Sequence, residues 1–537
     1  MANVTISRGP DESSCRTVSC ETGIVLMDVL TGAGVFTESP CGGRGICGKC
    51  KVRICPQGDP GSPGTELTEA ERSLLKPEEI ASGIRLACMT RITGDCLVEL
   101  PETGKEQRIL TDGYLPEFIR DHREGYGIAA DIGTTTIAMS LIDLASGKEL
   151  STASAVNAQK QYGLDVLSRI SFETEHGDNA VHILQKVLVD SCSSLIREVC
   201  GSAGVAPDCL KEIVIAANCC MTHMLLGRNA TGLGKAPYTP VFTEAQSLPA
   251  REIGLKAGPD TVLYCLPQVS AYIGGDIVAG AAVCRLNART GNVLFIDVGT
   301  NGEIVLARNG RLLCCSCAAG PALEGMNISC GMRASEGAVE DVRIGTQAEL
   351  TTIGGTPPAG LCGSGILAAV RELLKGGYIK KSGAFVALSD QPEPALLRVC
   401  GTRREAVLNR SPELVVTQDD VRQVQLAKGA ILSGFRVLLR EAGIAMEDLD
   451  QVIVAGQFGA HLPAESLTGT GILPEELKDR IVYAGNTSRS GACMALLSLE
   501  ERRNMEALAK EMDYTDLART ADYERIFAGS MKFPAGV

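Results

Sequence analysis

The sequence GIAADIGTTTIAM, residues 127–139, has the pattern of two short apolar strands joined by a tight turn. The turn contains an acid, a glycine and three hydroxyl residues, namely Asp131, Gly133, Thr134, Thr135 and Thr136. A glycine-rich hairpin lets backbone N–H groups approach phosphate oxygens, and an aspartate can hold Mg²⁺ through water. The stretch therefore predicts one half of a site that grips a nucleotide triphosphate.

A second stretch, VLFIDVGTNGEIV at residues 293–305, aligns with the first without gaps. The alignment pairs Asp131 with Asp297, and the second turn supplies Gly299, Thr300 and Asn301. An internal repeat of this kind predicts a duplicated α/β body with two similar lobes, 127–290 and 291–537. We expect Asp131 and Asp297 to be the catalytic groups, one from each lobe, on the two sides of the nucleotide.

The remaining periodic segments of the body fit the same layered α/β fold. Residues 183–199 and 421–439 each place apolar side chains on one face of a helix. The runs 213–216 and 481–484 are apolar and short, which predicts buried strands.

Four cysteines near the N-terminus predict an iron–sulfur cluster. The segment PCGGRGICGKC, residues 40–50, has the spacing C-x5-C-x2-C. Four thiolates are what a [2Fe-2S] cluster requires, and glycines let the loop bring N–H groups close to sulfur. The predicted ligands are Cys41, Cys47, Cys50 and Cys88. A zinc site is the alternative, although structural zinc usually pairs two C-x2-C motifs, and Cys55 could compete as a ligand.

The flanks of these cysteines predict a small α+β, ferredoxin-like (β-grasp) domain over residues 1–100. Short strands and helices are expected at 4–6, 24–30, 51–54, 67–71 and 96–100. Thr68 is a suitable cap for the second helix. Residues 101–126 carry many charges, with prolines and glycines but no periodic pattern, which predicts a linker. A tethered redox domain needs such a joint to move between donor and acceptor.

The composition excludes several classes of function. The net charge of the 537 residues is −13, so a nucleic-acid partner, which needs clustered Lys and Arg, is not expected. We found no apolar run of about 18 residues and no signal peptide, which predicts a cytoplasmic protein without a membrane partner. The 22 cysteines are then metal ligands and buried thiols rather than disulfides. Thiols in this number are easiest to keep in an anaerobe.

The duplicated hairpins resemble those of the acetate/sugar kinase, Hsp70 and actin (ASKHA) superfamily. Five segments resemble its two phosphate motifs, its adenosine motif and its two hinges: 131–136, 297–303, 452–459, 274–280 and 485–492. The resemblance implies ATP and Mg²⁺ as cofactors. It adds Gly456 and Gly459 to the expected nucleotide-binding residues.

A ferredoxin domain fused to this body resembles the reductive activators of corrinoid proteins. Further segments are similar to that family's body: 320–325, 329–334, 360–366 and 423–430. They add Gly320, Gly363 and Ser364 to the expected nucleotide site. The resemblance implies an ATP-hydrolysing activator that passes one electron from its cluster to Co(II) of a corrinoid protein in a methyltransferase system, restoring Co(I) for methyl transfer. It also implies an upstream electron donor.

Some members have an additional domain between linker and body, which contributes to dimerisation. Here the linker runs directly into Gly127, so we expect that domain to be absent, and a homodimer stays open.

Three other functions stay open at this point. One is a small-molecule kinase with a redox-sensing domain. Another is an ATP-driven activator of a different low-potential enzyme, such as a radical dehydratase. Those activators typically share one [4Fe-4S] cluster between subunits, against which the four N-terminal cysteines argue. The third is a non-enzymatic binding or chaperone module, which has no need of a redox cluster.

Several other residues are open to two interpretations. Cys314, Cys315 and Cys317 could form a second metal site, but buried small side chains at a strand end are the preferred interpretation. Ser316 could be a weak cobalt ligand. His223 and Lys428 could reach the cleft, although a core histidine and a solvated lysine are the simpler expectations.

Overall fold

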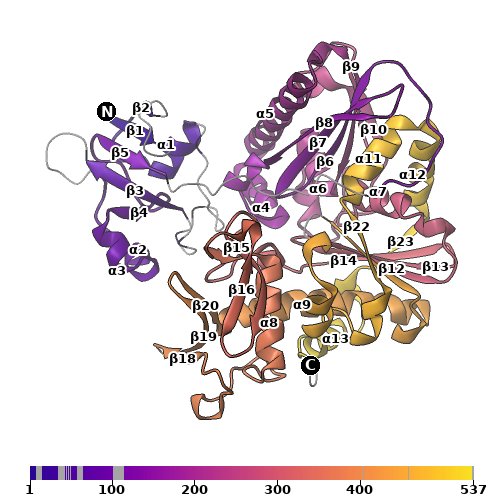
Figure 1. The fold of residues 1–537 in the computed structure, drawn as a ribbon. Coiled ribbons are helices and arrows are strands. Elements are labelled where there is room, and N and C mark those ends of the chain that lie inside the picture. Colours follow the sequence, from indigo (N-terminus) through magenta and orange to yellow (C-terminus); the bar gives the residue numbers. More distant parts are fainter. Residues whose placement is uncertain are drawn as a thin grey trace.

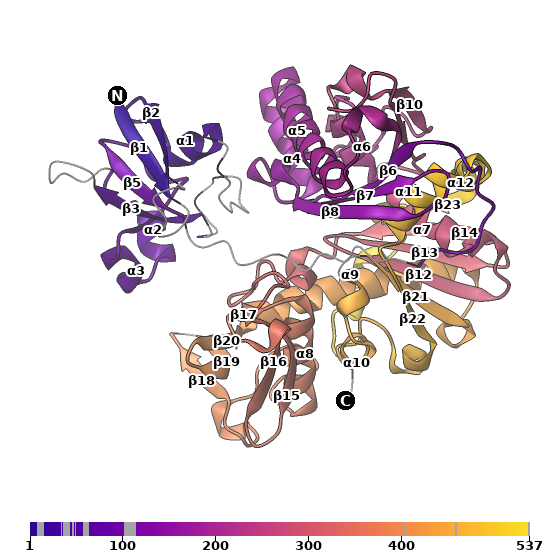
Figure 2. The ribbon, with the colours of Figure 1, turned by 45° about the horizontal axis from the view of Figure 1, so that its top comes forward.

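The computed structural model describes residues 1–7, 15–33, 35, 43, 45, 48, 50–56, 64–100, 114–401, 403–456 and 459–534. Figure 1 shows a small N-terminal unit beside a larger body, whose two lobes are stacked on each other. An insertion of strands and one helix extends from the lower lobe (Figure 2).

In its described residues, the N-terminal unit is a five-stranded sheet with three short helices. Its strands are β1 (Ala2–Ser7), β2 (Arg16–Cys20), β3 (Lys51–Pro56), β4 (Ile84–Leu86) and β5 (Cys96–Glu99), in the order β2-β1-β5-β3-β4. Its helices are α1 (Leu26–Gly32), α2 (Glu69–Leu74) and α3 (Pro77–Ala81). The expected Thr68 cap is present, because its side chain accepts a hydrogen bond from the Glu71 N–H. Its hydrophobic core shares no residue with those of the body.

The first lobe has a six-stranded sheet in the order β10-β11-β9-β6-β7-β8. The strands are β6 (Tyr126–Ile132), β7 (Thr136–Asp143), β8 (Glu149–Val156), β9 (Leu210–Ala217), β10 (Gln246–Pro249) and β11 (Val262–Cys265). The helices are α4 (Val166–His176), α5 (Asp178–Ser202), α6 (Cys219–Leu225) and α7 (Gly275–Val283). The helix expected at 183–199 lies within α5, and the strand at 213–216 within β9.

The second lobe has the sheet order β22-β21-β12-β13-β14-β23. Its strands are β12 (Asn292–Val298), β13 (Gly302–Arg308), β14 (Arg311–Cys317), β21 (Gln451–Ala455), β22 (Ile481–Gly485) and β23 (Met512–Tyr514). Its helices are α9 (Gln418–Ala442), α10 (Ala464–Gly469), α11 (Thr487–Leu497), α12 (Leu499–Glu511) and α13 (Tyr523–Ser530).

An insertion lies between β14 and α9. It contains α8 (Gly363–Lys375) and two three-stranded sheets. The strands are β15 (Ala338–Ile344), β16 (Ala348–Thr352), β17 (Gly360–Leu361), β18 (Leu397–Cys400), β19 (Arg403–Arg410) and β20 (Glu413–Thr417). The core of this insertion is continuous with that of the second lobe.

The two lobes repeat one topology, as the duplicated sequence predicts. In the first lobe β6, β7 and β8 form an antiparallel meander, with β9 and β11 parallel to β6 on its other side. In the second lobe β12, β13 and β14 form the same meander, with β21 and β22 in the places of β9 and β11. The fold class is therefore confirmed.

Helices α7 and α11 cross between the two sheets and join the lobes. Their apolar residues pack in one core with residues of both sheets, among them Ala129 and Phe295. A Cβ on Gly491 would lie only 2.4 Å from that of Ala279, and one on Gly280 would lie 2.6 Å from the Phe295 ring. Small residues at this crossing therefore set the distance between the lobes.

The strand expected at 481–484 differs in one respect from the prediction. The run 481–484 does form a strand, but β22 is the edge of the sheet, and Val482 and Tyr483 are 40% and 42% exposed. The prediction of a buried strand was wrong because apolar content does not reveal which strand ends a sheet.

The described part of the linker, 114–125, is bound to the body: the Tyr114 N–H donates to the Ala484 carbonyl.

Candidate functional site

The two hairpins meet in a cleft between the lobes. Asp131 lies at the end of β6 and Asp297 at the end of β12, where each strand turns into its hairpin partner. The Gly133 N–H donates to the Thr136 carbonyl (2.9 Å), which closes the first turn. Ten of the predicted residues line the cleft together: Asp131, Gly133, Thr134, Thr135, Thr136, Asp297, Gly299, Thr300, Asn301 and Gly456. Their roles stay predictions, but their convergence is what a two-sided phosphate grip needs.

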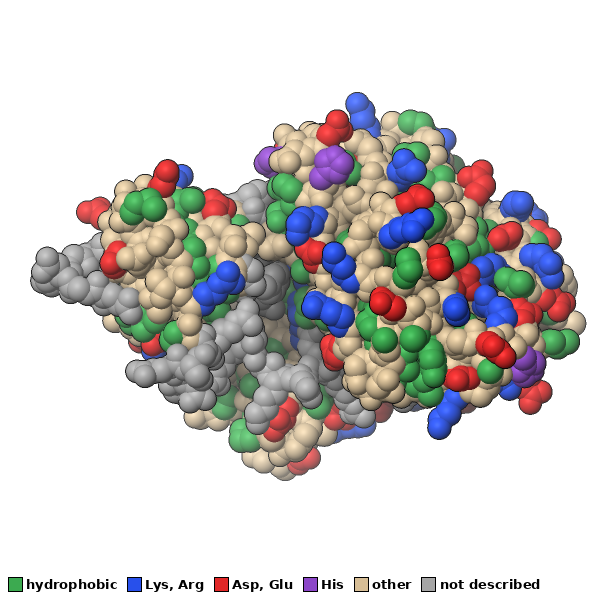
Figure 3. All heavy atoms as spheres, turned by 90° about the horizontal axis from the view of Figure 1, so that it is seen from above, with side chains coloured by type: hydrophobic (Ala, Val, Ile, Leu, Met, Phe, Trp, Pro, Cys, Tyr) green, Lys and Arg blue, Asp and Glu red, His purple; other side chains and the backbone are tan. Residues whose placement is uncertain are grey.

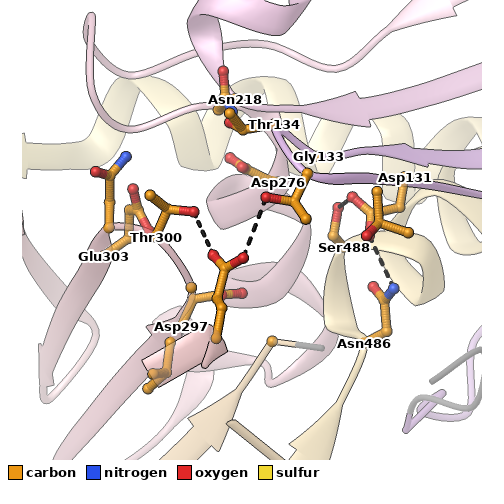
Figure 4. A pocket seen from close by; sticks show the side chains of 17 residues that line it. Asp131, Gly133, Thr134, Asn218, Asp276, Asp297, Thr300, Glu303, Asn486 and Ser488 are labelled. Atoms are coloured by element: carbon orange, nitrogen blue, oxygen red, sulfur yellow. Dashed lines mark hydrogen bonds between the residues drawn. The ribbon is translucent and has the colours of Figure 1, made fainter. Parts of the chain in front are cut away.

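The cleft is strongly acidic. It brings together five carboxyl groups: Asp131, Asp276, Asp297, Glu303 and Glu324. No lysine, arginine or histidine is among the described residues that line it. Figure 4 shows Asp276, Asp297 and Glu303 around the same space, with Asp131 to one side. A bound cation is therefore needed before a polyanion can enter.

Burial and mutual repulsion shift the pKa values of these acids. Burial, with the nearby Asp131 charge, raises the pKa of Asp276 to about 7. Burial, with the charges of Asp276 and Asp131, raises the pKa of Asp297 to about 8. The pKa of Glu303 is raised well above its usual value, first by burial and then by Asp276 and Asp297. Such carboxyls retain protons near neutral pH until a cation replaces them.

Asp131 is held by residues from the other end of the chain. The Asn486 side-chain amide donates to its Oδ2 (2.9 Å), and the Ser488 hydroxyl donates to its Oδ1 (2.8 Å; Figure 4). Burial raises the pKa of Asp131, and these two hydrogen bonds oppose that rise. Because Asn486 caps α11, the catalytic candidate of the first lobe is fixed by a helix that also belongs to the inter-lobe joint.

A buried cation lies behind the first hairpin. Arg169 is fully buried, and burial lowers the pKa of its guanidinium to about 10. It donates to the Thr134 carbonyl, the Gly163 carbonyl and the Gln159 side chain, none of which is charged. On the cleft side, the Asn218 side chain donates to the Thr134 hydroxyl (3.0 Å). Arg169 thus fixes the hairpin and, among the described residues, places a positive charge behind the expected phosphates without donating to a charged group.

The residues present fit ATP with Mg²⁺. Gly456 has φ +92°, and a Cβ there would lie 2.5 Å from Oδ1 of Asp297, so only glycine leaves this carboxylate its place. Among the described residues no three Cys, His, Asp or Glu side chains converge closely enough to hold a metal directly. Mg²⁺ would therefore be held through water and phosphate oxygens, with Asp131 and Asp297 orienting that shell.

Four predicted residues do not line the cleft. Gly320 precedes the 3-10 turn η7 (Pro321–Glu324), and Gly459 begins the turn Gly459–His461. Gly363 and Ser364 open α8, and a Cβ on Gly363 would lie 1.8 Å from the Leu323 carbonyl oxygen. Gly363 therefore allows α8 to pack against the turn that bears Glu324. Its effect on the cleft is indirect, through the position of that turn.

Five polar residues of the cleft were not among the predicted site residues: Asp276, Glu303, Glu324, Asn486 and Ser488. Asp276, Asn486 and Ser488 lie in the hinge-like segments that the sequence did reveal, within three residues after Gly275 or Gly485. A polar residue at the start of a small-residue helix, following a buried strand, is the signal that could have identified them.

The predicted cluster site is described only in part. Cys41 and Cys47 lie outside the described residues, whereas Cys50 and Cys88 lie close together, with the Cys50 thiol donating to Sγ of Cys88 (3.3 Å). Once Cys50 is ionised, its thiolate can accept a hydrogen bond from the Cys88 thiol, and this lowers the pKa of Cys50 to about 7, although burial opposes the change. Thiolates are the form that binds metal, so this pair fits one edge of a cluster. Gly45 and Gly48 have φ of +68° and +64°, as a loop folded round a cluster requires.

A buried ion pair holds the turn that carries Cys88. Arg85 donates through Nε to Oε1 of Glu71 (2.9 Å), and the Leu86 N–H donates to the same oxygen (3.1 Å). Although burial raises the pKa of Glu71, these bonds lower it to about 2 overall. Glu71 is thus ionised, and it fixes the backbone two residues before Cys88.

The structure also places the cysteines and the histidine for which the sequence left two interpretations open. Cys55 lies within β3 opposite Leu97, five residues from Cys50, which is about 16 Å along a strand. Cys314, Cys315 and Cys317 are buried in β14, and no described metal-binding group includes them. His223 is a core residue stacked on Phe242.

Two further candidates have partners of their own. The Lys428 ammonium is not solvated, as the simpler expectation had it, but buried, and it donates to the carbonyls of Ser530 and Lys532. The Ser316 hydroxyl donates to Glu303 (3.4 Å).

Three family models match the chain in series. One described as the 2Fe-2S iron-sulfur cluster binding domain matches residues 10–93, and one described as the RACo middle region matches 126–289. One described as the C-terminal domain of RACo, the ASKHA domain, matches 291–536. The cofactors are therefore a [2Fe-2S] cluster, ATP and Mg²⁺. In the described residues we find no helix both long and apolar enough to cross a membrane.

Named relatives cover most of the chain. A corrinoid activation enzyme RamQ from Eubacterium limosum is 29% identical over 92% of this chain and 93% of its own length. A [Co(II) methylated amine-specific corrinoid protein] reductase from Methanosarcina barkeri is 26% identical over 76% of this chain and 77% of its own. A solved structure, the reductive activator for corrinoid, iron-sulfur protein, has a TM-score of 0.69 and 29% identity over 99% of this chain and 98% of its own. With its cluster domain, paired lobes and phosphate hairpins in this order, the chain belongs to the RACo family of reductive activators of corrinoid proteins.

Proposed function

We propose that this protein uses ATP to pass one electron from its [2Fe-2S] cluster to Co(II) of a corrinoid protein, which restores the Co(I) form for methyl transfer. The observation that supports it most strongly is one chain that combines the Cys50–Cys88 pair with an acidic two-lobed cleft. The named relatives act on corrinoid proteins, as their names state. The upstream donor that loads the cluster is a further part of the proposal.

The need for ATP follows from redox energetics. A plant-type [2Fe-2S] centre has a potential of roughly −400 mV. The Co(II)/Co(I) couple is expected to lie lower, and for one electron each ~59 mV of mismatch costs about 1.4 kcal/mol. Nucleotide binding between the hairpins can offset such a cost only if it favours one docked state over another. The shared α7–α11 joint gives the cleft a direct mechanical link between lobes.

In this chain the cleft residues have distinct tasks. Thr134, Thr135 and Thr300 would donate hydroxyl hydrogen bonds to phosphate oxygens, while Asp131 and Asp297 would hold the hydrated Mg²⁺. Once a bound cation has displaced the proton of Asp297, its carboxylate would be available to accept a proton from the attacking water. The cluster supplies a single low-potential electron when it is bound.

The test is anaerobic absorbance spectroscopy of a Co(II) corrinoid protein mixed with the reduced, cluster-loaded protein. A Co(I) band that grows only with Mg-ATP is expected. Cys47→Ser and Asp297→Ala should each abolish it, the first by loss of the cluster and the second by loss of ATP turnover. ATP consumption without Co(I) across a panel of corrinoid proteins would contradict the proposal. Formation of a phosphorylated metabolite would then favour the kinase with a redox-sensing domain.

A further inference from the structure

One carboxylate connects the two phosphate hairpins directly. Glu324 ends η7, and its side chain is buried at the cleft. The Thr135 hydroxyl of the first lobe donates to its Oε2 (3.3 Å), and the Thr300 hydroxyl of the second lobe donates to its Oε1. Glu324 therefore accepts one hydrogen bond from each lobe.

The same two hydroxyls are the predicted phosphate donors. A threonine hydroxyl has one proton, so it can donate to the carboxylate or to a phosphate oxygen but not to both. A carboxylate and a terminal phosphate are also like charges, and their repulsion is strong in a partly buried site. Glu324 and a phosphate bound at this point must exclude each other.

ATP and ADP differ by the terminal phosphoryl group, which carries the additional negative charge. The point where donors of both hairpins converge is the point where a terminal group is gripped from both sides. We propose that Glu324 competes internally with the γ-phosphate for Thr135 and Thr300, and is the residue by which the protein distinguishes ATP from ADP. This inference rests on the proposed nucleotide site.

Movement of the displaced Glu324 carboxylate can be transmitted to the insertion through close backbone contacts. Gly325 follows it with φ +74°, and a Cβ there would lie 2.1 Å from the Met332 carbonyl oxygen. Gly363, at the start of α8, packs with similar closeness on the Leu323 carbonyl. Backbone packed this tightly moves as a unit. Release of Glu324 by the γ-phosphate therefore shifts η7 against α8 and the sheet β15–β17, whereas ADP leaves η7 in place.

The test is isothermal calorimetry of the full-length protein with Mg²⁺ and either a non-hydrolysable ATP analogue or ADP. Glu324→Gln keeps the size of the side chain and its capacity for hydrogen bonds but removes its charge. Glu349→Gln is the matched control, because Glu349 is an exposed acid on β16 of the same insertion. In Glu324→Gln we expect the Kd of the ATP analogue to fall about tenfold, as loss of one like-charge contact predicts. The Kd of ADP should change less than about twofold, and Glu349→Gln should change neither.

Equal shifts for both nucleotides, no shift, or weaker binding of the ATP analogue would overturn the competition. Should the wild-type protein bind neither nucleotide, the proposed nucleotide site itself would fail, and this inference with it. Hydrogen exchange of the wild-type protein tests the same point without a variant. The amides of Gly325 and Met326, bonded to the Ala322 and Pro321 carbonyls, should exchange faster with the ATP analogue but not with ADP. Unchanged exchange, or an equal change with ADP, would contradict the proposal.

Discussion

At the scale of single residues, the cleft sacrifices stability for cation binding. Asp276 and Asp297 are placed where burial and repulsion raise their pKa values to about 7 and 8. Natural proteins keep such unfavourable groups where function requires them. Arg169 behind the hairpin is the corresponding positive charge, and within the described part of the chain its hydrogen bonds go to neutral groups.

These pKa shifts give a pH dependence of known sign. A carboxyl whose pKa is higher in the folded state stabilises the fold below its unfolded pKa near 4, and the contribution is lost as pH rises through 7–8. Without Mg²⁺ or nucleotide, Asp276→Asn should therefore be more stable than wild type at pH 8, by about 2 kcal/mol. The difference in stability between Asp276→Asn and the wild type should shrink toward pH 5.

Thermal unfolding in a chelator at several pH values measures this. Asp260→Asn, an exposed acid of the first lobe, is the control and should change little. If Asp276→Asn were no more stable at pH 8, or if saturating Mg-ADP left the difference unchanged, the electrostatic account of the cleft would be wrong.

At the scale of elements, short helices fix functional turns through single buried groups. Helix α2 has six residues and is too short to be stable alone. Its capping box at Thr68 and the Glu71–Arg85 pair anchor it to the strand before Cys88. The position of Cys88 thus depends on Glu71, a side chain that is not a predicted cluster ligand.

Glu71→Gln should loosen the turn of Cys88 without touching a ligand. Breaking a buried ion pair costs about 3–5 kcal/mol, which for a small domain lowers the melting temperature by at least about 10 °C. The measurement is the temperature at which the visible circular dichroism of the bound cluster disappears. Glu69→Gln, on the exposed side of the same helix, should leave that temperature within about 2 °C. Equal behaviour of the two variants would contradict the role given to Glu71.

Local patterns in the sequence predicted the elements well and the contacts between them poorly. The ungapped repeat around Asp131 and Asp297 predicted both meanders, because hairpins are encoded within a few residues. Glu324 and Ser488 lie in segments that the sequence singled out, 320–325 and 485–492, but their part in the cleft was not predicted, because it depends on the packing of α8 and the crossing of α11. The edge position of β22 likewise depends on strand order rather than on its apolar residues.

At the scale of the whole molecule, the cluster domain and the two-lobed body must act together. The cluster domain has a core of its own, and the body has its lobes joined by α7 and α11. On the face shown in Figure 3, acidic and basic side chains are interspersed over the described surface. Electron delivery then depends on how the two units meet a corrinoid protein, and the candidate nucleotide cleft lies in the body.

The most direct test of this cooperation is a single-turnover experiment in an anaerobic stopped-flow instrument. Protein with a reduced cluster is mixed with one equivalent of Co(II) corrinoid protein, with Mg-ATP or without it. Oxidation of the cluster and growth of Co(I) should then proceed at the same rate, one electron each, and only with Mg-ATP. Co(I) formed at the same rate without ATP, or without oxidation of the cluster, would contradict the account.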